Sequence, residues 1–233
     1  MASAFAASLP QLGTLAKRLD ERVWQVSGGG IEIKFHEPGT LVPTLEMFDA
    51  VASGAVKAAF SSPSFWSDHA PALQIFAAVP FGPSAAEFLA WIYFGGGQPM
   101  LNEIYHRTGI HGVPCGLLAP EASGWFREEI HTLDDLVGLK MRFAGLGARV
   151  MEKLGVKTVA LAGGDIFMAP ETSAIDAAKF SMPAVDVKLG LHEMAKHYYF
   201  PGWHQPATLF ELIINSGKWN ALSPVRRAQI ETV

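Results

Sequence analysis

The stretch from Gly138 to Pro183 organises this chain. It opens with Gly-Leu-Lys-Met-Arg, residues 138–142, which predicts a short buried strand that ends in an arginine. A helical run follows, residues 146–154 and then 156–161. The stretch closes with Ala-Ile-Asp-Ala-Ala-Lys-Phe-Ser-Met-Pro, residues 174–183, which predicts a second strand with a lysine among apolar neighbours. A strand, a helix and a strand in that order form an α/β unit. Arg142 and Lys179 lie at its strand ends, where we look for an anionic ligand.

The composition excludes several classes of protein. The chain has 233 residues, a formal net charge of -4 and 49% hydrophobic residues, enough for one large domain or two modest ones. The negative charge argues against a nucleic-acid binder. No apolar run approaches the roughly 20 residues that span a membrane. The single cysteine, Cys115, excludes an internal disulfide. It follows a proline in an apolar setting, so we interpret it as a structural thiol rather than a nucleophile.

Working outward, helical and strand patterns alternate along the chain, which predicts an α/β fold. Thr132 and Asp135 predict a capping box at the start of a helix. The strand at 55–61 is almost purely apolar, as in a parallel sheet that is covered on both faces. We expect helices at 8–26, 44–52, 85–94, 100–107, 185–197 and 218–222, and strands at 31–35, 55–61, 110–118 and 209–215.

No catalytic constellation is visible. The eight histidines show no zinc spacing, and there is no Gly-x-Ser-x-Gly elbow. Arg142 differs, because an arginine in a buried strand needs an anion, and its planar fork suits a carboxylate. That anion is either a ligand or a structural carboxylate such as Asp176. Phe65 and Trp66 follow a strand at its carboxyl end, where ligands bind in open α/β sheets. They can equally be core aromatics.

Short motifs spread along nearly the whole chain carry a resemblance to one family. They are Ser8–Gly13, Leu45–Val51, Pro71–Gln74, Ala78–Gly82, Gly95–Gln98, Gly124-Trp125, Leu133–Leu136, Gly138–Arg142, Ala174–Ala177 and Tyr198–His204. Together they resemble the DctP-type solute-binding proteins of tripartite ATP-independent periplasmic (TRAP) transporters. The closest branch binds 2-oxo acids and related monocarboxylates.

The resemblance implies a type II periplasmic-binding-protein clam shell, with mixed sheets flanked by helices. We expect domain I at 1–118 plus 207–233 and domain II at 119–206. Met1–Leu9 does not look like a signal peptide. A helix that begins at Ser223-Pro224 is cut short by the end of the sequence. We therefore expect a piece of a longer protein, without the family's first strand and C-terminal helices.

The resemblance also implies a site. In the family, an arginine that matches Arg142 pairs with the substrate carboxylate. In the oxo-acid branch, a glutamine and a Glu-Trp pair hold a metal cation, and here those positions are Glu121 and Lys179-Phe180. Two tyrosines of the branch become Ser64 and Phe65. The expected substrate-binding residues are Arg142, Glu121, Lys179, Phe180, Phe65, Ser64, Trp66 and Trp125.

Lysine cannot ligate a cation while it is protonated. We therefore hypothesise that the Lys179 ammonium replaces the metal and lies beside Glu121, so that no cofactor is needed. The alternative is a decayed site in which Lys179 points to solvent.

The expected function follows from the resemblance. The chain would be a periplasmic binding protein, not an enzyme. It would capture a small organic acid and deliver it to TRAP membrane permease subunits, with no nucleic-acid partner. Whether it forms a homodimer stays open. The alternatives are an enzyme that acts on a small carboxylic acid and a non-binding fragment.

Overall fold

A computed structural model describes residues 1–161 and 175–233. Gly163-Gly164-Asp165 and the first residue of the expected second strand, Ala174, lie outside the described residues. The chain divides into two compact units. The first unit holds Met1–Ala77, Leu89–Leu117 and Leu209–Val233, and the second holds Ala78–Phe88 and Leu118–Thr208. We expected 78–88 in domain I, and the domain boundaries stay a prediction.

The first unit is built on a mixed sheet with the order β1-β2-β9-β3. The two-residue β1 pairs in parallel with β2, and β2 pairs antiparallel with β9, so this sheet is not purely parallel. Its strands are β1 (Ala2–Ser3), β2 (Ala58–Ser61), β3 (Ile110–Leu118) and β9 (Thr208–Asn215). The sequence did not predict β1, because a two-residue strand has no periodicity to detect, yet it pairs with the edge of β2. The expected absence of the family's first strand stays a prediction.

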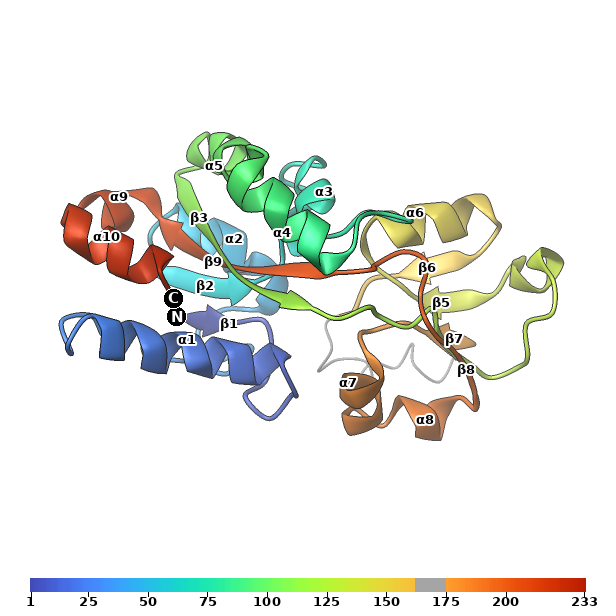
Figure 1. Ribbon diagram of the computed structural model, residues 1–233. Helices are drawn as coiled ribbons and strands as arrows, with labels where there is room; N and C mark the ends of the chain where they lie inside the picture. Colours follow the sequence, from blue (N-terminus) through green and yellow to red (C-terminus); the bar gives the residue numbers. More distant parts are fainter. Residues whose placement is uncertain (162–174) are drawn as a thin grey trace. The chain divides into compact units, whose positions relative to one another are not determined.

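Helices cover the sheet of the first unit on both faces, with α1 along one side and α5 along the other (Figure 1). They are α1 (Leu12–Val26), α2 (Met47–Ala52), α3 (Leu73–Ala77), α4 (Ala85–Phe94, which begins in the second unit), α5 (Gly97–His106), α9 (Ser216–Asn220) and α10 (Pro224–Glu231), with short 3-10 helices η1 (Thr44–Glu46) and η2 (Pro63–Trp66). Ser223 accepts a hydrogen bond from the Arg226 amide at the start of α10, as its sequence predicts.

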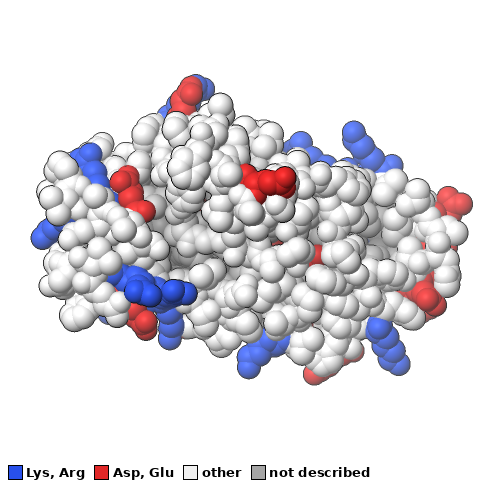
Figure 2. Space-filling view, viewed as in Figure 1, with Lys and Arg blue, Asp and Glu red and all other residues white. Residues whose placement is uncertain are grey.

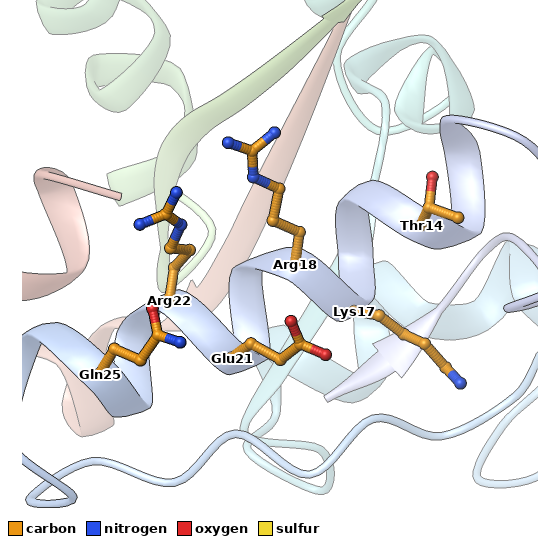
Figure 3. A pocket seen from close by; sticks show the side chains of 6 residues that line it. All are labelled: Thr14, Lys17, Arg18, Glu21, Arg22 and Gln25. Carbon is orange, nitrogen blue, oxygen red and sulfur yellow. The ribbon is translucent and has the colours of Figure 1, made fainter.

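Helix α1 is amphipathic, as predicted. Leu12, Ala16, Leu19 and Val23 are buried in the core. Its opposite face lines an open hollow of about 660 Å³ on the surface (Figure 3), formed by Thr14, Lys17, Arg18, Glu21, Arg22 and Gln25.

Strand β9 contributes to both faces of this core. Phe210 packs edge-on against Phe5, with ring centroids 5.4 Å apart. The next residue, Glu211, faces the other way and accepts a hydrogen bond of 2.5 Å from the Tyr105 hydroxyl of α5. Successive side chains of a strand point to opposite faces, so the burial of both residues shows that helices or loops cover each face.

The predicted strand at 31–35 does not form. Its apolar residues are half-buried and its polar ones exposed, so the alternation is real. The only pairing near it among the described residues is an isolated bridge from Ala2 to His36. Because this bridge is parallel, residues 31–35 run beside the chain ahead of Ala2, where the Met1 amino group donates to the Lys34 carbonyl over 2.8 Å.

The second unit holds a five-stranded mixed sheet with the order β6-β5-β7-β4-β8. Strand β5 runs parallel to β6 and β7, whereas β4 runs antiparallel to β7 and β8. The elements are β4 (Gly124–Phe126), β5 (Lys140–Arg142), α6 (Gly145–Lys153), β6 (Lys157–Val159), β7 (Ala177–Ala178), α7 (Pro183–Lys188), α8 (Leu191–Met194), β8 (His197–Tyr199) and the 3-10 helix η3 (Leu133–Leu136).

Three predicted helical features of this unit can be compared with the structure. The capping box of Thr132 and Asp135 is confirmed at η3. The helical run was wrong beyond residue 154, because Gly155 adopts a φ of 89° and the β-branched segment after it forms β6. The helix at 185–197 was wrong in extent: Gly190, with a φ of 78°, separates α7 from α8.

Candidate functional site

The centre of the site is a buried ion pair in the second unit. The Lys179 ammonium pairs with Oε2 of Glu121, and the two residues are only 5% and 3% exposed. The predicted proximity of these residues is confirmed, and the alternative of a solvent-facing Lys179 is wrong. Burial lowers the pKa of Lys179, and the Glu121 carboxylate opposes that shift. A buried charge is stable only when it is paired, and here each charge is the other's partner.

Further oxygen atoms surround the same ammonium. Lys179 Nζ also donates to the amide oxygen of Gln205. Thr208 Oγ1 donates to Glu121 Oε1 over 2.9 Å, and Gln205 Nε2 lies 3.2 Å from that same oxygen. Together they form a closed polar network around one cation. The sequence did not predict Gln205 or Thr208, which follow the aromatic turn and carry no motif of their own.

Backbone bonds hold this network in place. The Glu121 amide donates to the Gln205 carbonyl over 3.1 Å, and the Gly202 amide donates to the Glu121 carbonyl over 2.7 Å. A Cβ at Gly202 would lie 2.7 Å from the Glu121 carbonyl oxygen, so only glycine allows this approach. The Lys179 amide donates to the Arg142 carbonyl over 2.9 Å, which ties the lysine to the end of β5.

Arg142 is the last residue of β5 and is 5% exposed. Nε and Nη2 donate to the Leu161 carbonyl over 3.0 and 2.5 Å, and Nη1 donates to the Lys179 carbonyl over 2.5 Å. The guanidinium lies 5.0 Å from the centroid of the Phe180 ring. Burial lowers its pKa to about 10, which leaves it protonated at neutral pH.

The suggested structural partner of Arg142 was wrong. Asp176 instead accepts a 2.9 Å hydrogen bond from the Lys140 amide. A guanidinium has five N–H groups, and three of those on Arg142 have backbone acceptors. Within the part of the chain that the structure describes, the other two have none.

A second buried acid belongs to the site. Asp186 is fully buried, and it accepts hydrogen bonds from the Ser181 amide over 2.9 Å and from Trp125 Nε1 over 3.2 Å. Burial raises its pKa to about 6, although the Ser181 bond opposes the shift. No motif predicts a role for Asp186, because an aspartate three residues after Pro183 is ordinary in the first turn of a helix.

Aromatic side chains surround these charges. Trp125 packs against Tyr198 with ring centroids 4.2 Å apart. The Lys179 ammonium lies 5.8 Å from the Phe143 ring, which contacts His204 edge-on at 4.8 Å. Burial, with the nearby Lys179 charge, lowers the pKa of His204 to about 2, so this histidine is neutral.

Ser64, Phe65 and Trp66 lie in η2 of the first unit. Trp66 is fully buried and donates to Glu211 over 3.2 Å, and Phe65 lies 5.9 Å from Phe5 between ring centroids. Trp66 is therefore a core aromatic, whereas Phe65 is half-buried. A role of the three residues in ligand binding stays a prediction.

Figure 2 shows both signs of charge scattered over the viewed face, without a basic stripe. Among residues 1–161 and 175–233, no helix has the length and apolar character to cross a membrane. The same residues contain no cluster of three or more His, Cys, Asp or Glu side chains placed to hold a metal.

Comparison with known proteins places the chain among solute-binding proteins. It is 39% identical over 213 residues to a monocarboxylate 2-oxoacid-binding periplasmic protein of Nostoc sp., an alignment that covers 91% of this chain and 58% of that protein. The chain therefore spans less than two thirds of this curated relative.

Solved structures match more completely. A TRAP transporter solute-binding protein from Bordetella bronchiseptica, with calcium and picolinate in its active site, superimposes with a TM-score of 0.96 and 35% identity. The match covers all of this chain and 69% of that one. A TRAP periplasmic solute-binding protein from Pseudoalteromonas atlantica, with bound sodium and pyruvate, superimposes with a TM-score of 0.94 and 32% identity. That match covers 99% of this chain and 70% of the other.

The family assignment rests on the whole sequence. Residues 1–233 match DctP, the bacterial extracellular solute-binding proteins of family 7. The mixed α/β architecture agrees with the TRAP solute-binding structures. Members of this family are solute-binding proteins rather than enzymes. The chain belongs to the DctP family of TRAP solute-binding proteins.

Proposed function

We propose that this protein binds a small monocarboxylate in the periplasm and delivers it to the membrane permease of a TRAP transporter. The observation that carries the proposal is Arg142, a buried guanidinium with two N–H groups that lack acceptors among the described residues. Charge-assisted pairs of arginine and carboxylate are often bidentate, and they are stronger where water is excluded.

The backbone contacts of Arg142 support this role. Its bonds to the carbonyls of Leu161 and Lys179 hold the guanidinium plane, so a ligand need not order the side chain. Such preorganisation lowers the entropic cost of binding. The similar proteins bind pyruvate and picolinate, which both carry one carboxylate.

We further propose that binding here needs no metal. Two similar structures hold calcium or sodium together with the acid. In this chain the Lys179 ammonium lies among oxygens of Glu121 and Gln205, the kind of ligand that a hard cation prefers. A protonated lysine excludes such a cation by its charge and supplies the positive charge itself.

Isothermal titration calorimetry with pyruvate, lactate and picolinate tests the proposal, with EDTA present and absent. We expect binding of at least one acid, unaffected by EDTA, and a loss of at least 100-fold in affinity in Arg142→Gln. Arg107→Gln is the matched control, because Arg107 is exposed and pairs only with Glu103 on its own helix. The absence of binding to every acid would refute the proposed function, whereas chemical turnover of an acid would favour an enzyme. Loss of binding in EDTA would refute the metal-free site alone.

A further inference from the structure

The second unit buries two cations and two acids around one site, beside His204, whose lowered pKa leaves it neutral. Arg142 and Lys179 are cations, Glu121 and Asp186 are acids, and none is more than 5% exposed. With both acids ionised, the four charges sum to zero. The net charge of this site is therefore zero without a ligand, and an entering carboxylate makes the net charge negative. An excess charge in a medium of low dielectric is unfavourable unless a proton compensates it.

Only one of the four groups is placed to take that proton. The two cations are already protonated. Glu121 is already paired with the Lys179 ammonium, and its other oxygen accepts from Thr208 and Gln205. Asp186 has no ion pair among the described residues, and its two oxygens accept from neutral donors only.

We propose that the protein takes up a proton on Asp186 when it binds a monocarboxylate, so that the acid and the proton enter the site together. This inference rests on the proposed function. It adds that a proton from solvent, accepted by the protein's own aspartate, enters the site with the acid.

The charged groups around Asp186 determine whether ligand binding raises or lowers its pKa. The groups that act on it are Lys179, Glu121, Arg142 and the hydroxyl of Tyr198, and its own helix adds only the exposed Lys188. Glu121 already raises the pKa of Asp186, and a ligand carboxylate adds a second negative charge of the same effect.

The sign of the pH dependence follows from linkage. Because the pKa of Asp186 is about 6 without ligand and higher with it, binding takes up a proton between those two values. Affinity is therefore highest below pH 6. It falls by up to about tenfold per pH unit above that, until the pKa of the bound state is passed.

Calorimetry of the unaltered protein measures the proton directly. Pyruvate, or picolinate if it binds more tightly, is titrated at pH 7 in phosphate and in Tris, whose ionisation enthalpies differ. We expect an uptake of between about 0.5 and 1 proton per ligand, and a dissociation constant that rises about tenfold or more from pH 5.5 to pH 8.

Two variants assign the proton. Asp186→Asn should show an uptake near zero and an affinity that varies less than about twofold over the same pH range. Asp134→Asn, at an exposed aspartate of the same unit, should behave as the unaltered protein. If Asp186→Asn does not fold, carbon NMR of the Asp186 carboxyl, with and without ligand, replaces it and should show the pKa rise on binding.

The outcomes separate the two proposals. Binding without proton uptake, or uptake that persists in Asp186→Asn, overturns this inference and leaves the proposed function standing. Failure of every acid to bind overturns both.

Discussion

Lys179 and Glu121 form an ion pair in the interior of the second unit, with Gln205 and Thr208 completing the hydrogen bonds of the carboxylate. The two residues are 58 positions apart in the sequence, so the pair joins the segment before β4 to the segment after β7. Removal of one member leaves the other charged and buried, which is the costly case for an ion pair.

A double-mutant cycle measures that coupling. We expect Lys179→Met to lower the free energy of unfolding by about 3–5 kcal/mol, because Glu121 then loses its countercharge. The double variant Glu121→Gln/Lys179→Met should recover most of the loss. Urea unfolding at pH 7 gives the four values. The exposed pair of Arg107 and Glu103 is the control, and its cycle should show far weaker coupling. Additive effects of Glu121 and Lys179 would contradict a direct pair.

Reversal of the charge at Lys179 tests the replacement of the metal. Lys179→Glu places two carboxylates side by side, which repel each other and attract a hard cation. We expect its melting temperature to fall, and to rise again by several degrees in millimolar calcium.

The unaltered protein should show no such calcium effect. Lys188→Glu makes the same change of charge at an exposed position of α7 and serves as the control. A calcium response as large in the unaltered protein would show that Lys179 does not exclude the cation.

Local signals predicted much of the fold. The helix at 85–94 and the strand at 110–118 have the predicted bounds, and Thr132 and Asp135 form their capping box. These features depend on residues a few positions apart. The strand at 31–35 failed because alternation alone does not supply a neighbouring edge. Two glycines, at 155 and 190, ended helices where apolar periodicity continued.

The site was harder to predict because its contacts are distant in sequence. The resemblance matched Glu121 and Lys179 to metal-binding positions of the family, and their opposite charges then predicted that they pair. It could not show that Arg142 would be held by the carbonyls of Leu161 and Lys179, since every residue carries a carbonyl. Asp186 was missed for a similar reason: its function depends on burial against Trp125 rather than on its position in a motif.

The requirement for glycine at position 124, the first residue of β4, is steric and can be tested by substitution. Gly124 has a φ of 142°, and a Cβ there would lie 2.8 Å from Met141 Cε and 3.1 Å from the Ala178 carbonyl oxygen. We expect Gly124→Ala to lower the free energy of unfolding by about 2–4 kcal/mol, from backbone strain and crowding together.

Gly138→Ala separates the two contributions to that loss. Gly138 has a φ of 80° with no atom within 4 Å of the added Cβ, so it carries strain alone. Its loss of stability in urea should be about 1 kcal/mol. An equal loss at both glycines would show that crowding between β4 and its neighbours contributes nothing.

Glu211 of the first unit predicts a pH-dependent stability that has no part in ligand binding. It is fully buried, and burial raises its pKa to about 8, although bonds from Tyr105 and Trp66 oppose the shift. In the unfolded chain a glutamate titrates near 4.3. The folded protein therefore binds this proton more tightly than the unfolded chain does. The stability that the proton confers is complete below about pH 4, declines as the pH rises between the two values, and is absent above pH 8.

Glu211→Gln removes the titrating proton while its oxygen can still accept from Tyr105 and Trp66. We expect the unaltered protein to lose free energy of unfolding relative to this variant by up to about 1.4 kcal/mol per pH unit between pH 5 and pH 8. Urea unfolding of both proteins at several pH values measures the difference. Glu46→Gln, at an exposed position, should follow the unaltered protein throughout. A constant difference between Glu211→Gln and the unaltered protein over this range would show that Glu211 is already ionised in the fold.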